Sequence, residues 1–261
     1  MSTITEKLDQ TQVLDAVKHM YADVAVNPAK PFHFPTGLNS CRYLGYPEEE
    51  LQTVPESAVE SFAGVGYPFL ADIIQPGDTV VDVGSGSGVD VLIAARKTGT
   101  GGKVYGIDMT PQMITKAEEN ISNAGVSHVQ IIEGRADRIP LDDASVDVVT
   151  SNGVVNLVPE KEEAFREMYR ILKPGGRIQI ADIVLSKPVS DDSKSNAQLW
   201  AECIVGAEPS RVYSDLIRAA GFRNVTVIDR LDYFDRSTNE NTKKAAKGLG
   251  AHTVVLTGQK E

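Results

Sequence analysis

The sequence predicts an α/β fold in which a mostly parallel sheet carries helices on both faces. From residue 78 onward, short apolar runs alternate with segments of helical periodicity, an order typical of parallel sheets with crossover helices. A glycine-rich turn follows the first apolar run directly, where a nucleotide-binding loop would stand. The 261 residues suffice for one domain with an appended cap.

The region before the alternating segment has a different pattern. Residues 8–24 carry apolar side chains at helical spacing and predict a helix, whereas residues 27–35 hold three prolines and predict irregular backbone. A short helix is expected over residues 56–62. We therefore interpret residues 1–70 as an N-terminal helical cap and residues 71–261 as the sheet-containing domain.

The alternation itself predicts the remaining elements. Strands are expected over residues 79–83, 103–107, 129–132, 146–150, 177–184, 225–229 and 253–256. Helices are expected over residues 89–97, 111–124, 160–172, 197–205 and 210–220. The Lys-Pro-Gly-Gly run at 173–176 predicts a turn, and the polar stretch 235–250 predicts a loop with a helical turn.

Composition narrows the partners and the location. The formal net charge of −10 and the lack of a dense basic run argue against nucleic acid or an anionic membrane as partner. The chain has no long apolar run for a membrane span and no signal-peptide pattern, so the cytoplasm is expected. Its two cysteines, Cys41 and Cys203, are then expected to be free thiols. No metal-ligand cluster is visible, and the oligomeric state stays open, a monomer included.

The glycine-rich turn is the most informative motif. Gly84, Gly86 and Gly88 are spaced G-x-G-x-G, with Ser85 between the first two, and Asp82 stands two positions before Gly84. Glycines there let the backbone turn sharply and approach a ligand closely. A dinucleotide site would space them G-x-G-x-x-G to receive a pyrophosphate. The observed spacing and the acidic residue suit a ligand that presents an ammonium and a carboxylate instead.

A second acidic residue ends the next predicted strand. Asp108 lies 24 positions after Gly84, where a carboxylate can accept hydrogen bonds from both hydroxyls of a ribose. Met109, the next residue, has a side chain suited to pack on an adenine face. A lone glycine loop is also explained as a simple tight turn without a ligand. Here several motifs follow one another in order, which favours a binding site.

Together these motifs resemble the class I S-adenosylmethionine-dependent methyltransferases. The resemblance continues at residues 134–137, where the family holds the adenine edge, and at residues 172–176 before the fifth strand. It implies a Rossmann-like sheet of seven strands whose last strand runs antiparallel, with S-adenosylmethionine as cofactor and S-adenosylhomocysteine as product. The cofactor-binding residues it implies are Asp82, Gly84, Ser85, Gly86, Gly88, Asp108, Met109, Ala136, Asp137 and Ser151.

Segments outside that core look like the arsenite methyltransferases. They include residues 151–157, residues 200–206 and the cap segments 44–46 and 64–68. In that family thiolates hold arsenic(III), a soft centre, while its lone pair attacks the methyl group. This chain has Val65 and Gly153 where the family carries two of its cysteines, and of that set only Cys203 remains.

Three interpretations of the function remain open. The first is a methyltransferase that acts on another small molecule with a thiol-poor pocket, and the second is transfer to arsenite through Cys41 and Cys203. The third is a non-catalytic S-adenosylmethionine-binding protein or a Rossmann-type oxidoreductase. The acceptor-site candidates are Cys203, Asn152 and Tyr21, beside Asn156, Trp200 and His33, each of which is also explained by simple packing.

Overall fold

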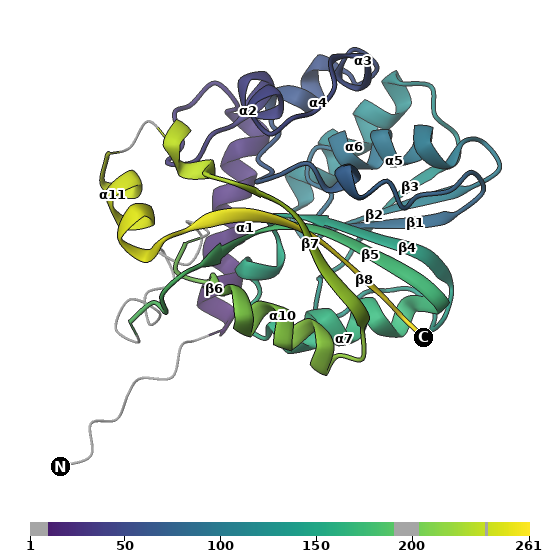
Figure 1. The fold of residues 1–261 in the computed structure, drawn as a ribbon. Coiled ribbons are helices and arrows are strands. Elements are labelled where there is room, and N and C mark those ends of the chain that lie inside the picture. The colour runs from purple at the N-terminus through teal and green to yellow at the C-terminus, as the bar shows by residue number, and fades with distance from the viewer. Residues whose placement is uncertain (1–9, 191–203, 238–239) are drawn as a thin grey trace.

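The computed structural model describes residues 10–190, 204–237 and 240–261, and its core is one eight-stranded sheet (Figure 1). The strand order is β3-β2-β1-β4-β5-β8-β7, with β6 paired to β5 alongside this path. The bounds are β1 Thr79–Val83, β2 Lys103–Asp108, β3 Val129–Glu133, β4 Val146–Asn152, β5 Leu172–Leu185, β6 Glu208–Pro209, β7 Arg223–Leu231 and β8 His252–Gln259. β8 runs antiparallel to both neighbours and the other pairings are parallel.

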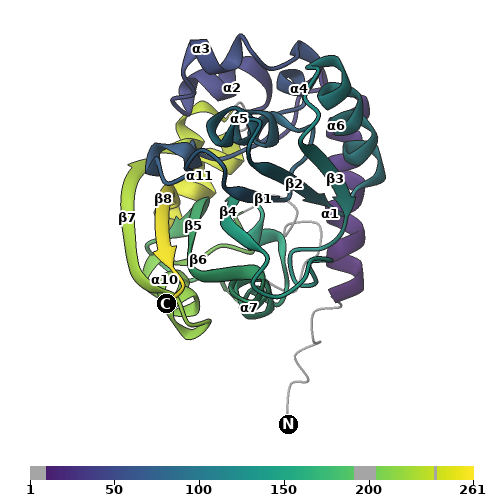
Figure 2. The same ribbon diagram turned by 90° about the vertical axis from the view of Figure 1, so that its right-hand side faces the viewer.

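Helices cover both faces of the sheet, as the alternation predicts (Figures 1 and 2). Helices α5 (Val89–Thr98) and α6 (Pro111–Asn123) lie on one face, and α7 (Lys161–Ile171) and α10 (Ser210–Ala219) on the other. Successive residues of a strand point to opposite faces, so Val80 packs toward α5 whereas Val81 packs toward α7. The α/β class with a mostly parallel sheet is therefore confirmed.

The N-terminal part is helical and lies largely on the α5 face. It consists of α1 (Gln10–Val26), α2 (Gly37–Tyr43), α3 (Glu48–Leu51), α4 (Glu56–Glu60) and the 3-10 turn η1 (Pro68–Ala71). Helix α1 packs on α6 and reaches past the sheet toward α7, where Gln10 donates to Glu160 at 2.6 Å (Figure 2). Short helices α2 to α4 stand above α5 and α6 (Figure 1). This arrangement gives the sheet a cap on one side.

Three elements differ from the sequence-based expectation. Residues 173–176 do not separate a helix from a strand, because β5 already begins at Leu172 and takes them up as a bulge between the pairs Val146–Leu172 and Val148–Arg177. Residues 240–249 form the helix α11 (Glu240–Leu249) instead of a loop, with Thr242 and Ala246 buried at helical spacing. The two-residue strand β6 raises the strand count from seven to eight. Most of the helix expected over 197–205 lies outside the described residues.

A buried polar cluster fixes the turn that follows β4. Asp182 of β5 is fully buried and accepts hydrogen bonds from Tyr213 Oη at 2.9 Å and Asn156 Nδ2 at 2.7 Å. Asn156 belongs to the 3-10 turn η2 (Val155–Leu157), so these bonds tie η2 to the sheet and to α10. Burial raises the pKa of the Asp182 carboxyl to about 6, although these donors and the backbone N–H groups of Asn156 and Ile183 act in the opposite direction.

The Tyr213→Phe substitution tests this cluster. It leaves a buried carboxylate short of one donor, and we expect the free energy of unfolding to fall by about 1–3 kcal/mol in urea denaturation. Tyr169→Phe on α7 is the matched control, because its ring packs edge-on to Phe222 and no donor or acceptor among the described residues meets its hydroxyl. An equal loss in both variants would contradict a special role for the Tyr213 hydroxyl.

Candidate functional site

A single large cavity opens at the carboxyl ends of β1, β2 and β4. It combines apolar side chains with a few polar groups, a lining typical of small-molecule and cofactor sites. Several parts of the chain meet there: the inner face of α1, the segment after α4, the glycine loop, the end of β2 with the start of α6, and the turns after β3 and β4. In an open α/β sheet this edge is where ligands bind, because strands end there and loops diverge.

The glycine loop keeps the cavity open at the end of β1. Gly84 has a φ of 77°, and a Cβ placed on it would lie 2.1 Å from Val154 Cγ2 of the opposite wall. Both Gly84 N and Ser85 N donate to Ile107 O, at 2.7 and 3.0 Å, which anchors the loop to β2. Any side chain at position 84 would therefore strain the backbone and fill the space that a ligand needs.

Asp108 supports the loop from the end of β2. Its Oδ2 accepts the Gly86 N–H at 2.8 Å and its Oδ1 accepts the Thr110 N–H at 2.8 Å. Burial raises the pKa of the Asp108 carboxyl, and these backbone donors act in the opposite direction. Asp108 and Met109 both line the cavity. Asp108, which the sequence analysis assigns to the ribose, thus also holds the glycine loop in place.

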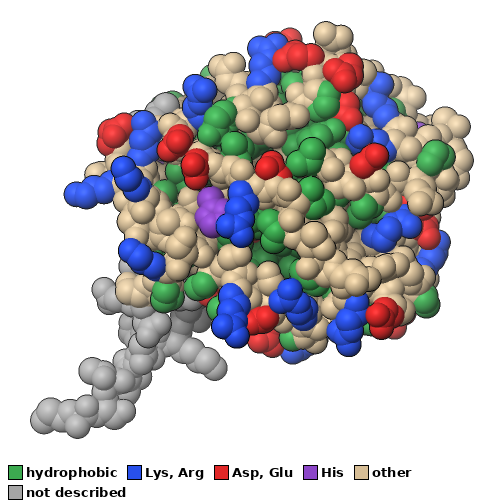
Figure 3. All heavy atoms as spheres, viewed as in Figure 1, with side chains coloured by type: hydrophobic (Ala, Val, Ile, Leu, Met, Phe, Trp, Pro, Cys, Tyr) green, Lys and Arg blue, Asp and Glu red, His purple; other side chains and the backbone are tan. Residues whose placement is uncertain are grey.

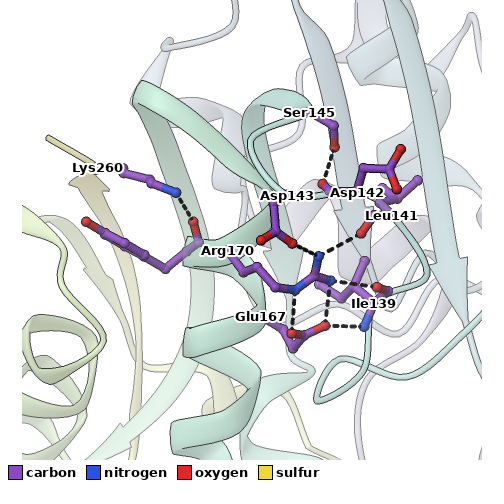
Figure 4. A network of polar contacts seen from close by, with 9 residues as sticks. Ile139, Leu141, Asp142, Asp143, Ser145, Glu167, Arg170 and Lys260 are labelled. Carbon is purple, nitrogen blue, oxygen red and sulfur yellow. Dashed lines mark hydrogen bonds and ion pairs between the residues drawn. The ribbon is translucent and has the colours of Figure 1, made fainter.

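The turn after β3 forms the far end of the cavity. Gly134, Arg135, Ala136 and Asp137 line it, and Arg135 is paired with the Asp137 carboxylate. Arg170 of α7 holds the chain just beyond this turn (Figure 4), because its guanidinium donates to Ile139 O at 2.9 Å. The Glu167 carboxylate in turn accepts the Ile139 N–H at 2.8 Å. The Ala136–Asp137 wall is therefore fixed from outside the cavity.

Two buried polar groups face the cavity without a partner. Asp82, at 2% exposure, lines the cavity, and among the described residues its carboxylate has no hydrogen bond or ion pair. Burial, with the nearby charges of Asp90 and Asp108, raises the pKa of Asp82 well above its usual range. Ser85 Oγ is likewise buried and unpaired within the described chain. Buried polar groups are normally satisfied, so both indicate a polar ligand.

Asn152 lies at the end of β4 and joins the cap to the sheet. Its Oδ1 accepts the backbone N–H of Val65 at 2.8 Å and of Gly66 at 3.2 Å, and its Nδ2 donates to Gly66 O at 2.9 Å. A Cβ on Gly64 would lie 2.4 Å from Asn152 Nδ2, so only glycine allows this close approach. Asn152 lines the cavity, with its amide turned mainly to the cap.

Apolar side chains make up much of the rest of the cavity lining. Tyr21 lines the cavity from α1, and its ring is stacked on Phe34 with centroids 6.1 Å apart. Other apolar lining residues are Leu14, Val17, Phe62, Ala63, Val89, Ile107, Met113, Val154, Leu157 and Val158. Arg135 is the one lysine or arginine among the described lining residues, and Asp137 already neutralises it.

Besides Cys41, four of the described candidates lie outside the cavity lining. Gly88 begins α5 with a φ of 95°, and Ser151 is fully buried with Oγ donating to Val83 O at 3.0 Å. Asn156 faces Asp182 instead of the cavity, because its Nδ2 donates a hydrogen bond to the buried Asp182 carboxylate. Burial lowers the pKa of His33 to about 4, so its imidazole is neutral near pH 7, and it does not line the cavity.

The positions that correspond to thiols in the arsenite methyltransferases lie side by side. A Cβ on Gly153 would be 3.1 Å from Val65 Cγ1, so the two positions at which the resemblance implies thiols are close together and carry none here. Cys41 is fully buried on α2 and does not line the cavity. Burial and the nearby Asp90 carboxylate raise the pKa of its thiol. Cys203 and Trp200 lie outside the described residues.

Sequence reasoning missed Tyr46 and Asp90. Asp90 lines the cavity from the first turn of α5, and Tyr46 Oη donates to Asp90 Oδ1 at 2.6 Å. A signal for Asp90 exists in the sequence, since it is a single charged residue in the apolar run 89–95. Tyr46 carries no comparable local signal, because its role depends on the cap folding over α5.

Comparison with known proteins agrees with this geometry. A family model described as a methyltransferase domain matches residues 74–245, which include the glycine loop, Asp108 and the turns after β3 and β4. The chain belongs to this methyltransferase family. Its sheet, glycine loop and acidic strand ends are those of the class I S-adenosylmethionine-dependent methyltransferases, whose cofactor is S-adenosylmethionine.

Individual relatives place the chain near the arsenite methyltransferases. It is 39% identical to an arsenite methyltransferase of Halobacterium salinarum over 85% of this chain and 56% of that protein. It is 35% identical to a ubiquinone/menaquinone biosynthesis C-methyltransferase of Escherichia fergusonii over 44% of this chain and 46% of that protein. An arsenic(III) S-adenosylmethionine methyltransferase from Chlamydomonas reinhardtii has a TM-score of 0.64 at 26% identity, covering 86% of this chain and 74% of that one.

The chain spans only about half the length of the curated relatives it matches.

In the described part no helix has the length and apolarity to span a bilayer. On the face shown in Figure 3, lysines and arginines alternate with acidic side chains and form no continuous basic area.

Replacement of Asp108 tests the cofactor assignment. Asp108→Ala removes an acceptor for the ribose and releases the Gly86 N–H, so we expect the dissociation constant of S-adenosylhomocysteine to rise about 10- to 100-fold in calorimetry. Glu133→Ala is the control, because Glu133 ends β3 opposite Asp108 but does not line the cavity. Unchanged affinity in Asp108→Ala would refute the assignment.

Proposed function

We propose that this protein transfers the methyl group of S-adenosylmethionine to a small organic acceptor. The observation that carries the proposal is the lining of the cavity, which combines buried polar groups with apolar side chains from other elements. The polar groups belong to the glycine loop, Asp82 and Asp108, and the apolar side chains to α1, η2 and the segment after α4. Polar groups for the cofactor and apolar side chains for an acceptor suit a two-substrate transfer.

The residues present fit the cofactor. When bound, S-adenosylmethionine supplies an electrophilic methyl group on a sulfonium ion. The order of strands supports an adenine beside Ala136 and Asp137 after β3, a ribose at Asp108 on β2, and a methionine moiety at Asp82 on β1. Gly88 and Ser151 would act from outside the cavity, by starting α5 and by fixing the end of β4 against β1.

The apolar lining residues would hold and shield the acceptor. Tyr21, with Leu14 and Val17 on the same face of α1, would exclude water from the reacting centre. Asn152 would keep the cap closed over the cavity through its bonds to Val65 and Gly66. Direct in-line transfer needs no covalent step on the protein, so holding the two reactants at near-attack distance supplies much of the rate.

Arsenite is the second candidate acceptor, and the likeness to the Halobacterium salinarum protein favours it. Three observations weigh against it. Val65 and Gly153 leave no thiol at two positions, and Cys41 is buried with a thiol pKa raised by burial. Cys203 would remain as a single thiolate, and one sulfur holds a soft metalloid poorly.

The domain division, the location and the class of partner are part of the same proposal. We infer that residues 1–70 act as the cap and residues 71–261 as the cofactor-binding domain, because the cavity lies between α1 and the sheet edge. We also infer a cytoplasmic enzyme whose partner is a small molecule and not nucleic acid. The net charge of −10 and the mixed surface charges in Figure 3 support this inference.

A transfer assay separates the two acceptors. With methyl-labelled S-adenosylmethionine, we expect label in an organic product from a protein-free cell extract and no methylated arsenic from arsenite in excess thiol, because the described cavity lining is rich in apolar side chains and holds no cysteine. Asp108→Ala serves as the inactive control. Methylated arsenic formed by the native protein and lost in Cys203→Ser would contradict the organic acceptor and establish arsenite.

A further inference from the structure

Asp90 is a buried carboxylate that neither the glycine motif nor the acidic strand ends account for. It lies in the first turn of α5 at 6% exposure and lines the cavity. Its neighbours Val89, Val91 and Leu92 are buried and apolar. A charge in such a helix costs stability unless something compensates for it, so its presence calls for an explanation.

Two donors from other parts of the chain fix the orientation of this carboxylate. Tyr46 Oη donates to Oδ1 at 2.6 Å, and Asn152 Nδ2 donates to Oδ2 at 3.0 Å. Tyr46 is itself buried and held edge-on between the rings of Phe62 and Tyr67, with centroids 5.1 and 4.7 Å away. Neither donor carries a positive charge, so the carboxylate is oriented without being neutralised.

Among the described residues, no lysine or arginine side chain of the cavity pairs with its buried carboxylates near Asp90. The Asp82 carboxylate is also buried, lines the same cavity and has no partner among the described residues. Arg135, the lining cation, is paired with Asp137 at the far end. Nowhere in the described ranges do three histidine, cysteine or acidic side chains group as metal ligands, so an organic cation fits better.

The order of the strands locates Asp90 along the cofactor. β2, β1 and β4 are adjacent, and their carboxyl ends carry Asp108, Asp82 and Asn152. With the ribose at Asp108, the methionine moiety extends over β1 toward β4. Asp90 accepts a hydrogen bond from Asn152 at the end of β4, and its charge helps raise the pKa of Asp82 on β1, so it lies at the methionine end.

We propose that Asp90 is a second anionic contact, beside Asp82, for the ammonium group of the cofactor's methionine moiety, and that Tyr46 and Asn152 are the positioning residues that aim it. This inference rests on the proposed function. It gives the cap a direct link to the cofactor, because Asn152 also holds the backbone of Val65 and Gly66.

The charge of Asp90 makes this contact dependent on pH. Burial raises the pKa of its carboxyl to about 6, and the bonds from Tyr46 and Asn152 act against that rise. The titratable groups that face it are Asp82 on β1, Cys41 on α2, Glu50 on α3, Tyr46 and Tyr67. Below its pKa the protonated carboxyl loses its attraction for an ammonium, so cofactor affinity falls as pH falls through about 6.

The test compares two ligands that differ at the methionine end. S-adenosylhomocysteine carries the ammonium, whereas 5′-methylthioadenosine keeps the adenosine and sulfur without it. For Asp90→Asn we expect the dissociation constant of S-adenosylhomocysteine to rise about 10- to 100-fold and that of methylthioadenosine to stay unchanged. The native protein should also bind S-adenosylhomocysteine more weakly at about pH 5 than at about pH 8, a difference reduced in Asp90→Asn.

The control is Asp147→Asn, which removes a carboxylate paired with Lys173 at the opposite end of β4 and should change neither affinity. If Asp90→Asn does not fold, Tyr46→Phe replaces it, with a smaller loss again confined to S-adenosylhomocysteine. Equal losses for both ligands would reduce Asp90 to a structural role, and no loss for either would overturn the contact. If the native protein binds neither ligand, the proposed function itself fails.

Discussion

The amide of Asn152 is the contact on which the site's architecture depends. It stands at the end of β4 and bonds three separate parts of the chain: the backbone at Val65 and Gly66, the hydroxyl of Tyr46 and the carboxylate of Asp90. An amide offers donors and an acceptor in one plane, so it can satisfy backbone groups of both kinds at once. The cap, the sheet and α5 are thereby held around one cavity.

Electrostatics explains why that cavity favours a cationic cofactor. Asp82, Asp90 and Asp108 approach one another in a region of low polarity, and burial raises the pKa of each carboxyl. A ligand that carries a sulfonium and an ammonium relieves this repulsion, whereas a pyrophosphate would add to it. The G-x-G-x-G spacing agrees with this. It lets the backbone approach the ligand closely, but it is not the spacing of a site for a pyrophosphate.

Much of this was predictable from local sequence. The glycine loop, Asp108 and the Ala136–Asp137 turn depend on residues that follow individual strands, and the cavity brings them together. The helix over Glu240–Leu249 was missed because its polar composition hides a narrow apolar stripe. Asn156 was expected near the ligand, but the buried Asp182 on a distant strand determines where its amide points.

The acceptor side shows where sequence reasoning ends. That Val65 and Gly153 lie close together follows from the cap folding onto β4, which no spacing along the chain reveals. Tyr46 and Asp90 are 44 positions apart and meet only because the segment between α2 and α3 packs against the start of α5. Such pairs are set by tertiary packing, so their chemistry appears only in the folded molecule.

The most direct test of the account is a crystal structure of the protein with S-adenosylhomocysteine. We expect adenine against Ala136, the ribose hydroxyls on Asp108 and the ammonium between Asp82 and Asp90. A ligand bound outside this cavity, or bound with its adenine over β4, would contradict it.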